Sequence, residues 1–420
     1  MVLLVMLLPC LGRWVSGRAG LVRGADIAVL LFCLWYGVSF AATEGLSAAV
    51  EPAGINMIEV AGAYFLARCY IRNHDDFCRM IHSLFMIMLV LLPFAVVESF
   101  TGRNIIAEFF GQFLNADAAV TGGGTRWGLR RANSVFDHPI MFGVAAATLL
   151  PLAHLVLGGN SSALRRWVRD SVIVCLTFLS LSSAPIGLTA LLITLIAWDT
   201  LLRSFPFRWH VVAVAFASAY FAVDILSNQT PVEFYIHRFT FEGQTGWYRL
   251  LIWDYGTASV AANPLFGIGL DEWARPAWMV SSSIDSFWLV QFVRTGVPGG
   301  VLMLAIFGLA ALASVRVTPA TEGVRMCQTA YLLSLFGLFF TGATVHFWGA
   351  GLVLFLFIVG SGMWIAETGR GKPEGTRWPL SHTPREVCSE LSSERHRVHG
   401  SVRDLRQRTP NQGSGSAEET

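Results

Sequence analysis

The sequence is poor in charge, and this deficit argues against a soluble protein. Charged residues make up only 14% of the 420 residues, whereas hydrophobic residues make up 54%. A soluble globular chain carries about 25% charged residues. The mean hydropathy of +0.55 agrees with the low charge. We therefore expect an integral membrane protein rather than a set of soluble domains.

Basic runs and paired cysteines are also missing. The net charge is only +2 and Lys372 is the single lysine, so we expect no nucleic-acid partner. The seven cysteines show neither CxxC pairs nor the spacing of metal ligands. Most of them lie in apolar stretches, where a thiol behaves as a small hydrophobic group. The sequence thus predicts no disulfide framework, no metal site and no cofactor.

Long apolar runs are what the chain has in abundance. A helix needs about 20 residues to cross a bilayer, and open sheet edges do not survive there. The pattern predicts an all-α polytopic bundle of about eleven spans, or twelve, over residues 1–366. The runs lie at 1–12, 26–43, 55–71, 80–100, 136–158, 170–184, 185–202, 210–226, 286–314, 326–342 and 347–366. The first is short, as is 170–184, and residues 182–185 read as a turn between two antiparallel helices.

Arginine positions predict how the bundle is oriented. Basic residues gather in alternate loops: Arg13, Arg18, Arg23, Arg68, Arg72, Arg79, Arg165, Arg166, Arg169, Arg203, Arg208, Arg316 and Arg325. By the positive-inside rule this face is cytoplasmic, and eleven spans place the C-terminus on the same side. The polar tail 367–420 has too few large apolar residues to form a core, so we expect it to be disordered.

Two loops on the opposite face, 101–135 and 227–285, carry arginines against this rule. These are Arg103, Arg126, Arg130, Arg131, Arg238, Arg249 and Arg275. A guanidinium is a planar fork of donors that matches phosphate oxygens and stays charged. The arginines therefore suit a lipid-linked diphosphate at the outer leaflet. The alternative is that they pair with carboxylates of the same loops, namely Glu108, Asp117, Glu233 and Glu242.

Residues 246–262, within the larger loop, have helical periodicity. One face of this helix carries Arg249, Ile252, Trp253 and Gly256. Tryptophan and tyrosine on the segment suit the headgroup region, so we predict a short amphipathic helix lying on the membrane. The alternative is a re-entrant turn packed between spans. The next segment, 263–269, is rich in turn residues, and its GIG is not a dinucleotide fingerprint because no strand precedes it.

Four pieces of the chain, in order, resemble the O-antigen ligase and Wzy-type polysaccharide polymerase family. They are residues 130–143 (RRANSVFDHPIMFG), 180–187 (SLSSAPIG), 247–269 (from WYRLLIW to NPLFGIG) and 283–299 (from SIDSFWL to RTGVPG). The match depends on the order and spacing of these four pieces, and it covers about residues 130–310. The second piece lacks the arginine that is usual in the family.

The resemblance implies a glycosyltransferase at the periplasmic face of a bacterial inner membrane. Such enzymes move a glycan from an undecaprenyl-diphosphate carrier to an acceptor hydroxyl, inverting the anomeric centre without a metal. Polymerases extend another carrier-linked repeat unit in exopolysaccharide or O-antigen biosynthesis, alongside chain-length regulators or export proteins. Ligases instead use lipid A core as acceptor. The ligase histidine and asparagine are replaced here by Asp285 and Ser286, which favours a polymerase.

Within this resemblance, Arg249 and Asp285 are the candidate catalytic residues. Arg249 matches the arginine of the family's tryptophan-containing piece. It would stabilise the charge that grows on the diphosphate as the glycosyl bond breaks. Asp285 would accept the proton of the acceptor hydroxyl. The alternative is that Asp285 caps the helix beginning at Phe287.

Five further residues are candidates for substrate binding: Arg130, Arg131, His138, Trp253 and Arg294. His138 precedes a proline that favours the start of a helix, so a helix-start role is its alternative. Arg294 lies about 12 Å into its span, where a charge is expensive and normally faces protein or water. It would bind the carrier phosphate or pair with Glu59 or Glu98. Gly296 and the glycines after it predict close helix packing or a kink.

Two rival functions belong to other classes. A transporter or flippase for a lipid-linked glycan would also have many spans and arginines that face a phosphate. Transporters often contain inverted repeats, however, and no second copy of the pieces in 130–310 occurs. A scaffold subunit of a polysaccharide export assembly would need no arginine chemistry. The long loop on one face favours the enzyme.

Overall fold

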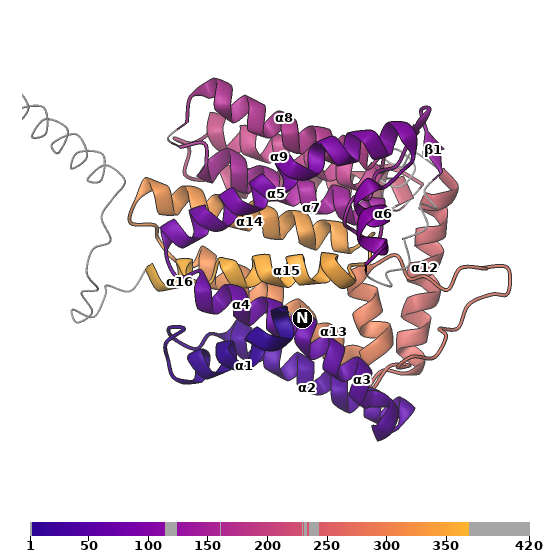
Figure 1. Ribbon diagram of the computed structural model, residues 1–420. Coiled ribbons are helices and arrows are strands. Elements are labelled where there is room, and N and C mark those ends of the chain that lie inside the picture. Colours follow the sequence, from indigo (N-terminus) through magenta and orange to yellow (C-terminus); the bar gives the residue numbers. More distant parts are fainter. Residues whose placement is uncertain are drawn as a thin grey trace, which may run out of the picture. The chain divides into compact units, whose positions relative to one another are not determined.

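The computed structural model describes residues 2–113, 124–159, 161–228, 230, 233–234 and 243–368, and these are mostly helical (Figure 1). The helices are α1 (Val2–Val15), α2 (Gly24–Glu44), α3 (Leu46–Asn56), α4 (Ala63–Tyr70), α5 (His74–Thr101), α6 (Ile105–Gly111), α7 (Pro139–Pro151), α8 (Ala163–Leu179), α9 (Ser183–Leu201), α10 (Arg208–Leu226), α12 (Gly243–Ala262), α13 (Phe287–Val315), α14 (Glu322–Gly342), α15 (Gly349–Ser361) and α16 (Ile365–Thr368). Two π-helical turns, η1 (Met57–Gly62) and η2 (Leu152–Val156), join α3 to α4 and extend α7. Two short strands, β1 (Thr125–Arg126) and β2 (Leu129–Arg130), pair antiparallel in a hairpin. The all-helical class is as predicted, while α6 and the hairpin were not foreseen.

Eight of the described helical segments are long and apolar enough to cross a membrane. They are α2, α5, α7 with η2, α9, α10, α13, α14, and α15 with α16. Each of the eleven predicted apolar runs falls on a helical stretch, but three of them do not meet this length and hydropathy. The short ones are α1 with 14 residues and α8 with 17, and in the third run, 55–71, the π-helical turn η1 interrupts the α-helix. Eleven spans therefore stay a prediction.

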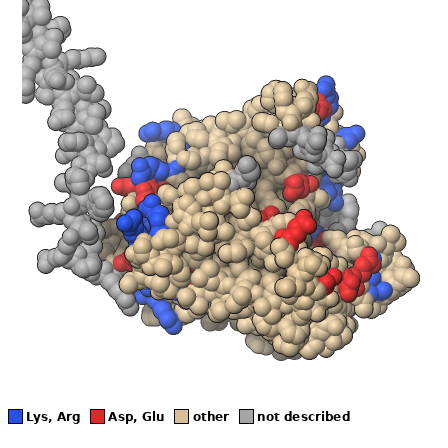
Figure 2. Space-filling view, turned by 60° about the horizontal axis from the view of Figure 1, so that its bottom comes forward, with Lys and Arg blue, Asp and Glu red and all other residues tan. Residues whose placement is uncertain are grey.

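The surface has the charge distribution that a membrane would require. Figure 2 shows one broad face on which Lys and Arg side chains lie towards the left and right margins, with none of them across the middle. Many large apolar side chains are exposed, for example Phe216 and Phe221 of α10. Helix α10 has no buried residue. Such a surface suits lipid better than water.

Helix α7 lies at the centre of one group of helices. It packs against α5, α8, α9, α14 and α15, and all but one of its 13 residues are buried. Small side chains permit this close approach. A Cβ on Gly143 would lie only 2.7 Å from Pro185 at the start of α9. The first turn of α7 is thereby held against the turn between α8 and α9.

A second group contains α1 to α4 and α13, with α14 and α15 between the two groups (Figure 1). Arg68 of α4 sits in a buried ionic cluster here, with no exposed side-chain surface. Its Nε lies 3.2 Å from Oδ1 of Asp26, and Nη2 lies 3.1 Å from Oε1 of Glu367. The same guanidinium donates to the carbonyls of Ala19 and Leu21. Arg68, predicted to face the cytoplasm in a loop, instead joins α2, α4 and α16.

Helix α13 is broken at Gly296, where φ is 71° and ψ is −177°. The segment 263–269 lies against the break. The N–H of Ile268 donates to the carbonyl of Val293 at 3.0 Å. A Cβ on Gly267 would come within 2.5 Å of that carbonyl oxygen, and its φ of 66° suits glycine. The predicted kink is confirmed, and the turn-rich segment pairs with the backbone that the kink exposes.

Candidate functional site

One cavity brings together four of the seven candidate residues. It has a volume of about 330 Å³, a size typical of small-molecule sites. Arg131, His138, Arg249 and Asp285 line it. Two lining residues, Arg126 and His346, were not predicted as site residues. We call this space the polar cavity.

Four helices begin at the polar cavity. His138 is the N-cap of α7, Ser182 of α9 and Trp348 of α15, and all three line the cavity. Asp285 directly precedes Ser286, the N-cap of α13. The first turn of a helix carries partial positive charge and points N–H groups outward, so helix N-termini favour anions. Their convergence reinforces the charge of the arginines.

Arg126 of the hairpin and Arg131, which directly follows β2, lie against the turn between α8 and α9. Nη2 of Arg131 donates to Oγ of Ser182 at 2.7 Å, and its Nε donates to the carbonyl of Ser180 at 3.4 Å. Nη1 of Arg126 donates to the carbonyl of Leu181 at 2.8 Å. Leu181 has a φ of 44°, so this turn is tight. The serine-rich turn has no arginine of its own, and two arginines, one in the hairpin and one just after it, lie beside it.

Arg249 reaches the polar cavity from α12. Its side chain is largely buried, with 8% exposed. Ile252 and Gly256 on the same face are buried too, and a Cβ on Gly256 would lie 2.6 Å from a methyl carbon of Leu289 in α13. The predicted helix is thus confirmed and begins at Gly243. Whether α12 lies on a membrane stays a prediction.

Asp285 is held by a neighbouring hydroxyl rather than by a helix terminus. Oγ of Ser283 donates to its Oδ1 at 2.7 Å. The N-cap of α13 is Ser286, whose Oγ accepts the N–H of Leu289 at 3.3 Å. The interpretation of Asp285 as the capping residue is therefore wrong. A capping role for Ser286 leaves the carboxylate of Asp285 on the cavity wall.

Two histidines contribute neutral rings to the cavity. Nδ1 of His138 accepts the N–H of Ile140 at 3.2 Å, which confirms its helix-start role. A neutral ring with this acceptor carries its proton on Nε2. Burial and the nearby charge of Arg131 lower the pKa of His138, against an opposing effect of Asp285. Burial lowers the pKa of His346 to about 4, although Asp285 opposes the shift.

The lowered pKa of His346 predicts a pH-dependent stability. An exposed histidine has a pKa of about 6.5, so the unfolded chain binds the proton more tightly than the folded chain does. Stability is then complete above about pH 6.5 and falls as the pH decreases towards 4. We expect the melting temperature in detergent to fall less between pH 7 and pH 5 for His346→Gln than for the wild type. Equal falls in the two proteins would contradict this assignment.

Three predicted site residues lie outside the wall of the polar cavity. Trp253 donates its Nε1–H to the carbonyl of Ala343 at 3.1 Å, which fastens α12 to the segment containing His346. Arg130 lies against Gly102 at the end of α5, and its carbonyl accepts a hydrogen bond from Ser99. Trp253 and Arg130 therefore hold segments next to the polar cavity and do not line it.

Arg294, the third, binds backbone instead of a carboxylate. Its Nη1 donates to the carbonyls of Gly269 and Asp271 at 2.8 and 2.6 Å. The predicted pairing with Glu98 is wrong, because Glu98 accepts the N–H groups of Asn133 and Ser134. No ion pair with Glu59 occurs among the described contacts. Arg294 therefore holds the segment that follows residue 268 against the break in α13.

The alternative of pairing within the loops holds for two other arginines. Arg103 forms an ion pair with Glu108 at 2.7 Å, and Arg275 forms one with Glu272 at 3.0 Å. Asp117, Arg238 and Glu242 lie outside the described residues. Among the described outer-face arginines, Arg103 and Arg275 therefore pair within the loops, whereas Arg126, Arg131 and Arg249 line the polar cavity.

The chain belongs to the class of mostly helical proteins with several candidate membrane spans and one polar cavity bounded by helix N-termini. No protein-family model matches the chain, and no curated protein matches it significantly.

Proposed function

We propose that the protein is a membrane glycan polymerase. It transfers a glycan from an undecaprenyl-diphosphate carrier to an acceptor sugar hydroxyl at the periplasmic face of a bacterial inner membrane. The observation that carries the proposal is the polar cavity: Arg131, Arg249 and Asp285 come from three separate pieces of the family resemblance and line one space. The serine turn, from the remaining piece, lines it too.

In this proposal the arginines stabilise the diphosphate leaving group. As the bond between the anomeric carbon and the phosphate oxygen breaks, its electron pair passes to the diphosphate. Arg249 and Arg131 lie where they would stabilise this growing charge, and Arg126 adds a third guanidinium. Arg131 is already oriented by Ser182. Donors fixed before the reaction are the most effective kind.

In this proposal Asp285 is the base that activates the acceptor hydroxyl. The acceptor oxygen forms the new bond to the anomeric carbon, and its proton passes to the carboxylate of Asp285. Attack from the face opposite the diphosphate inverts the anomeric centre. His138, neutral and with its proton on Nε2, would donate a hydrogen bond to the substrate rather than act as the base. The protein needs no metal for these steps.

The direction of the helices agrees with this placement. Helices α7, α9, α13 and α15 all begin at the polar cavity, so their ends lie on the other side of the bundle. The predicted cytoplasmic arginines 165, 166, 316 and 325 belong to connections at that side. With the cavity periplasmic, the chain end that follows α15 and α16 is cytoplasmic.

A lipid-linked glycan transporter is the alternative from another class. The break of α13 at Gly296 favours it, because interrupted helices are typical of transporter binding sites. The presence of a carboxylate beside arginines in one cavity favours the enzyme, since a transporter has no need of a base. An O-antigen ligase would use the same chemistry with lipid A core as acceptor.

Deletion of the gene in its host separates these functions. For the polymerase, we expect polysaccharide gels to lose long polymer while short repeat units are still made, with rescue by the wild type and none by Asp285→Asn. Long polymer left on its carrier would identify the ligase. Repeat units that accumulate only at the cytoplasmic leaflet would identify the transporter. Full rescue by Asp285→Asn would overturn the assigned base.

A further inference from the structure

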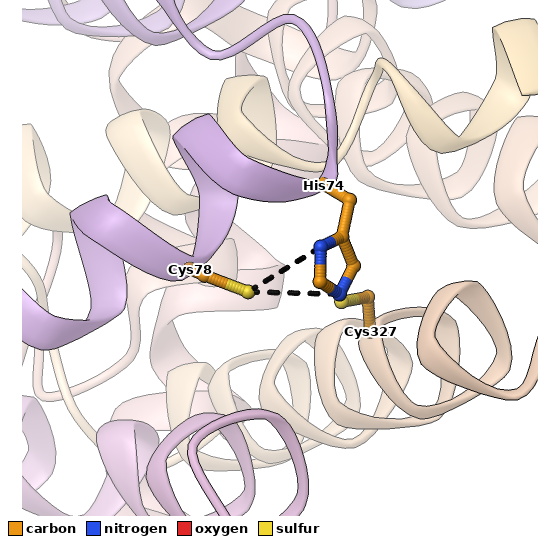
Figure 3. Close-up of side chains that lie close together, drawn as sticks. All are labelled: His74, Cys78 and Cys327. Atoms are coloured by element: carbon orange, nitrogen blue, oxygen red, sulfur yellow. Dashed lines mark hydrogen bonds between the residues drawn. The ribbon is translucent and has the colours of Figure 1, made fainter. Parts of the chain in front are cut away.

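Three side chains with metal-binding atoms meet at the start of α5, far from the polar cavity. His74 and Cys78 are four residues apart on one face of α5, and Cys327 comes from α14. Figure 3 shows the three side chains pointing toward one another. Their ligand atoms all lie within 4.8 Å of one another. The spacing of the cysteines alone predicted no such group, because the third residue comes from a distant part of the chain.

The distances suit a small metal ion. Sγ of Cys78 lies 3.8 Å from Nδ1 and 3.7 Å from Nε2 of His74. In a tetrahedral zinc site each ligand atom lies about 2.0 to 2.3 Å from the metal, so neighbouring ligand atoms are about 3.5 Å apart. The three residues therefore need only small movements to close around an ion. Both cysteines are free thiols.

A neighbouring carboxylate orients the histidine for metal binding. Oδ1 of Asp75 lies 3.1 Å from Nδ1 of His74. A carboxylate at this place fixes the ring proton on Nδ1, which leaves the lone pair of Nε2 available as a ligand. This pairing of carboxylate, histidine and metal is a common second shell around zinc. The first turn of α14 lies beside this atom, since a Cβ on Gly323 would be 3.2 Å from Nε2.

The three residues differ in how deeply they are buried. Cys327 is fully buried, whereas the His74 side chain is 43% exposed. Solvent can therefore reach the ion and fill a fourth position. Two thiolates and one imidazole select a thiophilic or borderline ion over magnesium or calcium. On the predicted cytoplasmic face, reducing conditions keep both thiols available.

We propose that His74, Cys78 and Cys327 form a zinc site that joins the start of α5 to α14. Its function is structural, because about 36 Å of helix separates His74 from Glu98 at the far end of α5. Glu98 holds the backbone of Asn133 and Ser134 ahead of α7. At the far end of α14, the carbonyl of Gly342 accepts the hydroxyl of Ser286. The ion would fix the spacing of two helices whose opposite ends support the polar cavity.

The test measures zinc in the full-length protein, purified in detergent with an affinity tag that lacks histidine and cysteine. We expect one zinc per chain, and a thiolate-to-cobalt charge-transfer band after exchange with Co²⁺. Cys327→Ser should lower the zinc affinity by more than about 100-fold, and Asp75→Asn by about 10- to 100-fold. Cys175→Ser, in α8, and Cys388→Ser are matched controls that keep the metal.

Chelation of the wild-type protein tests whether the zinc site stabilises the fold, and this test does not depend on the folding of a variant. A chelator should lower the melting temperature of the wild type, and added zinc should restore it. Absence of zinc and of the cobalt band in the wild type would overturn the proposal. So would a cobalt band that survives in Cys327→Ser but not in Cys388→Ser.

Discussion

Replacement of Arg249 by alanine is expected to abolish glycan transfer while the protein remains folded. The side chain is 8% exposed and lines the polar cavity, so its charge acts where water is largely excluded. Loss of one donor that stabilises a developing charge lowers the rate by about 10²- to 10³-fold. Because that charge develops only as the bond breaks, kcat and kcat/KM should fall by similar factors.

The measurement compares purified variants on an undecaprenyl-diphosphate-linked substrate. Arg249→Lys keeps the charge but loses the planar fork, so we expect a rate between those of the wild type and Arg249→Ala. Arg103→Ala is the matched control, because Arg103 is exposed and paired with Glu108 on the same predicted face. Wild-type transfer by Arg249→Ala would remove Arg249 from the mechanism and favour the scaffold or the transporter.

Replacement of Arg68 by alanine should have the largest effect on stability. Three nitrogens of its guanidinium bind four groups, and neither Arg68 nor Asp26 has exposed side-chain surface. Removal of one partner leaves the other charge buried, which destabilises a protein by about 3 to 5 kcal/mol. The remaining partners of Asp26 are the side chains of Tyr64 and Trp14 and the backbone N–H of Arg23, and all three donate neutral hydrogen bonds. They do not replace the lost charge.

Denaturation of the purified variants in mixed micelles measures this effect. Arg72→Ala is the control, because Arg72 also binds Glu367 but its side chain is 26% exposed. We expect a clearly smaller loss of unfolding free energy for Arg72→Ala than for Arg68→Ala. The double variant Asp26→Asn, Arg68→Met should recover part of the loss, since both charges are removed together. Equal effects of Arg68→Ala and Arg72→Ala would contradict a buried ionic cluster.

Hydropathy predicted where helices occur but not where they end. The run at 80–100 predicted a helix that in fact begins at His74, where the side chain of Asn73 caps it and Asp75 and Asp76 fill the first turn. These polar residues extend the helix beyond its apolar part, and hydropathy has no means of detecting them. In the same way, the predicted amphipathic helix at 246–262 begins at Gly243.

The candidate site was predictable only where a local motif contains its residues. Arg131, Arg249 and Asp285 stand in the family-like pieces and line the cavity. Arg126 lies in a hairpin that has no apolar pattern, and His346 lies in a turn between two apolar runs, so periodicity says nothing of either. Arg294 stands in a matching piece but faces the segment beside the helix break. Its direction depends on the left-handed backbone of Gly296, which sequence spacing does not define.

Helices α7, α9, α13 and α15 share one direction, so their C-terminal ends also lie on one side, away from the polar cavity. Four parallel dipoles present carbonyl groups there, and carbonyls at a helix terminus attract cations. Arginines meet this need: Nη2 of Arg166 donates to the carbonyl of Gly158 beyond η2, and Nη2 of Arg23 donates to that of Ala366 in α16. The arginines that the positive-inside rule uses to predict the cytoplasmic face therefore also bind carbonyls at helix ends. If that prediction holds, a reversed insertion would place these helix-terminating arginines on the translocated side, and insertion and folding would favour the same arrangement.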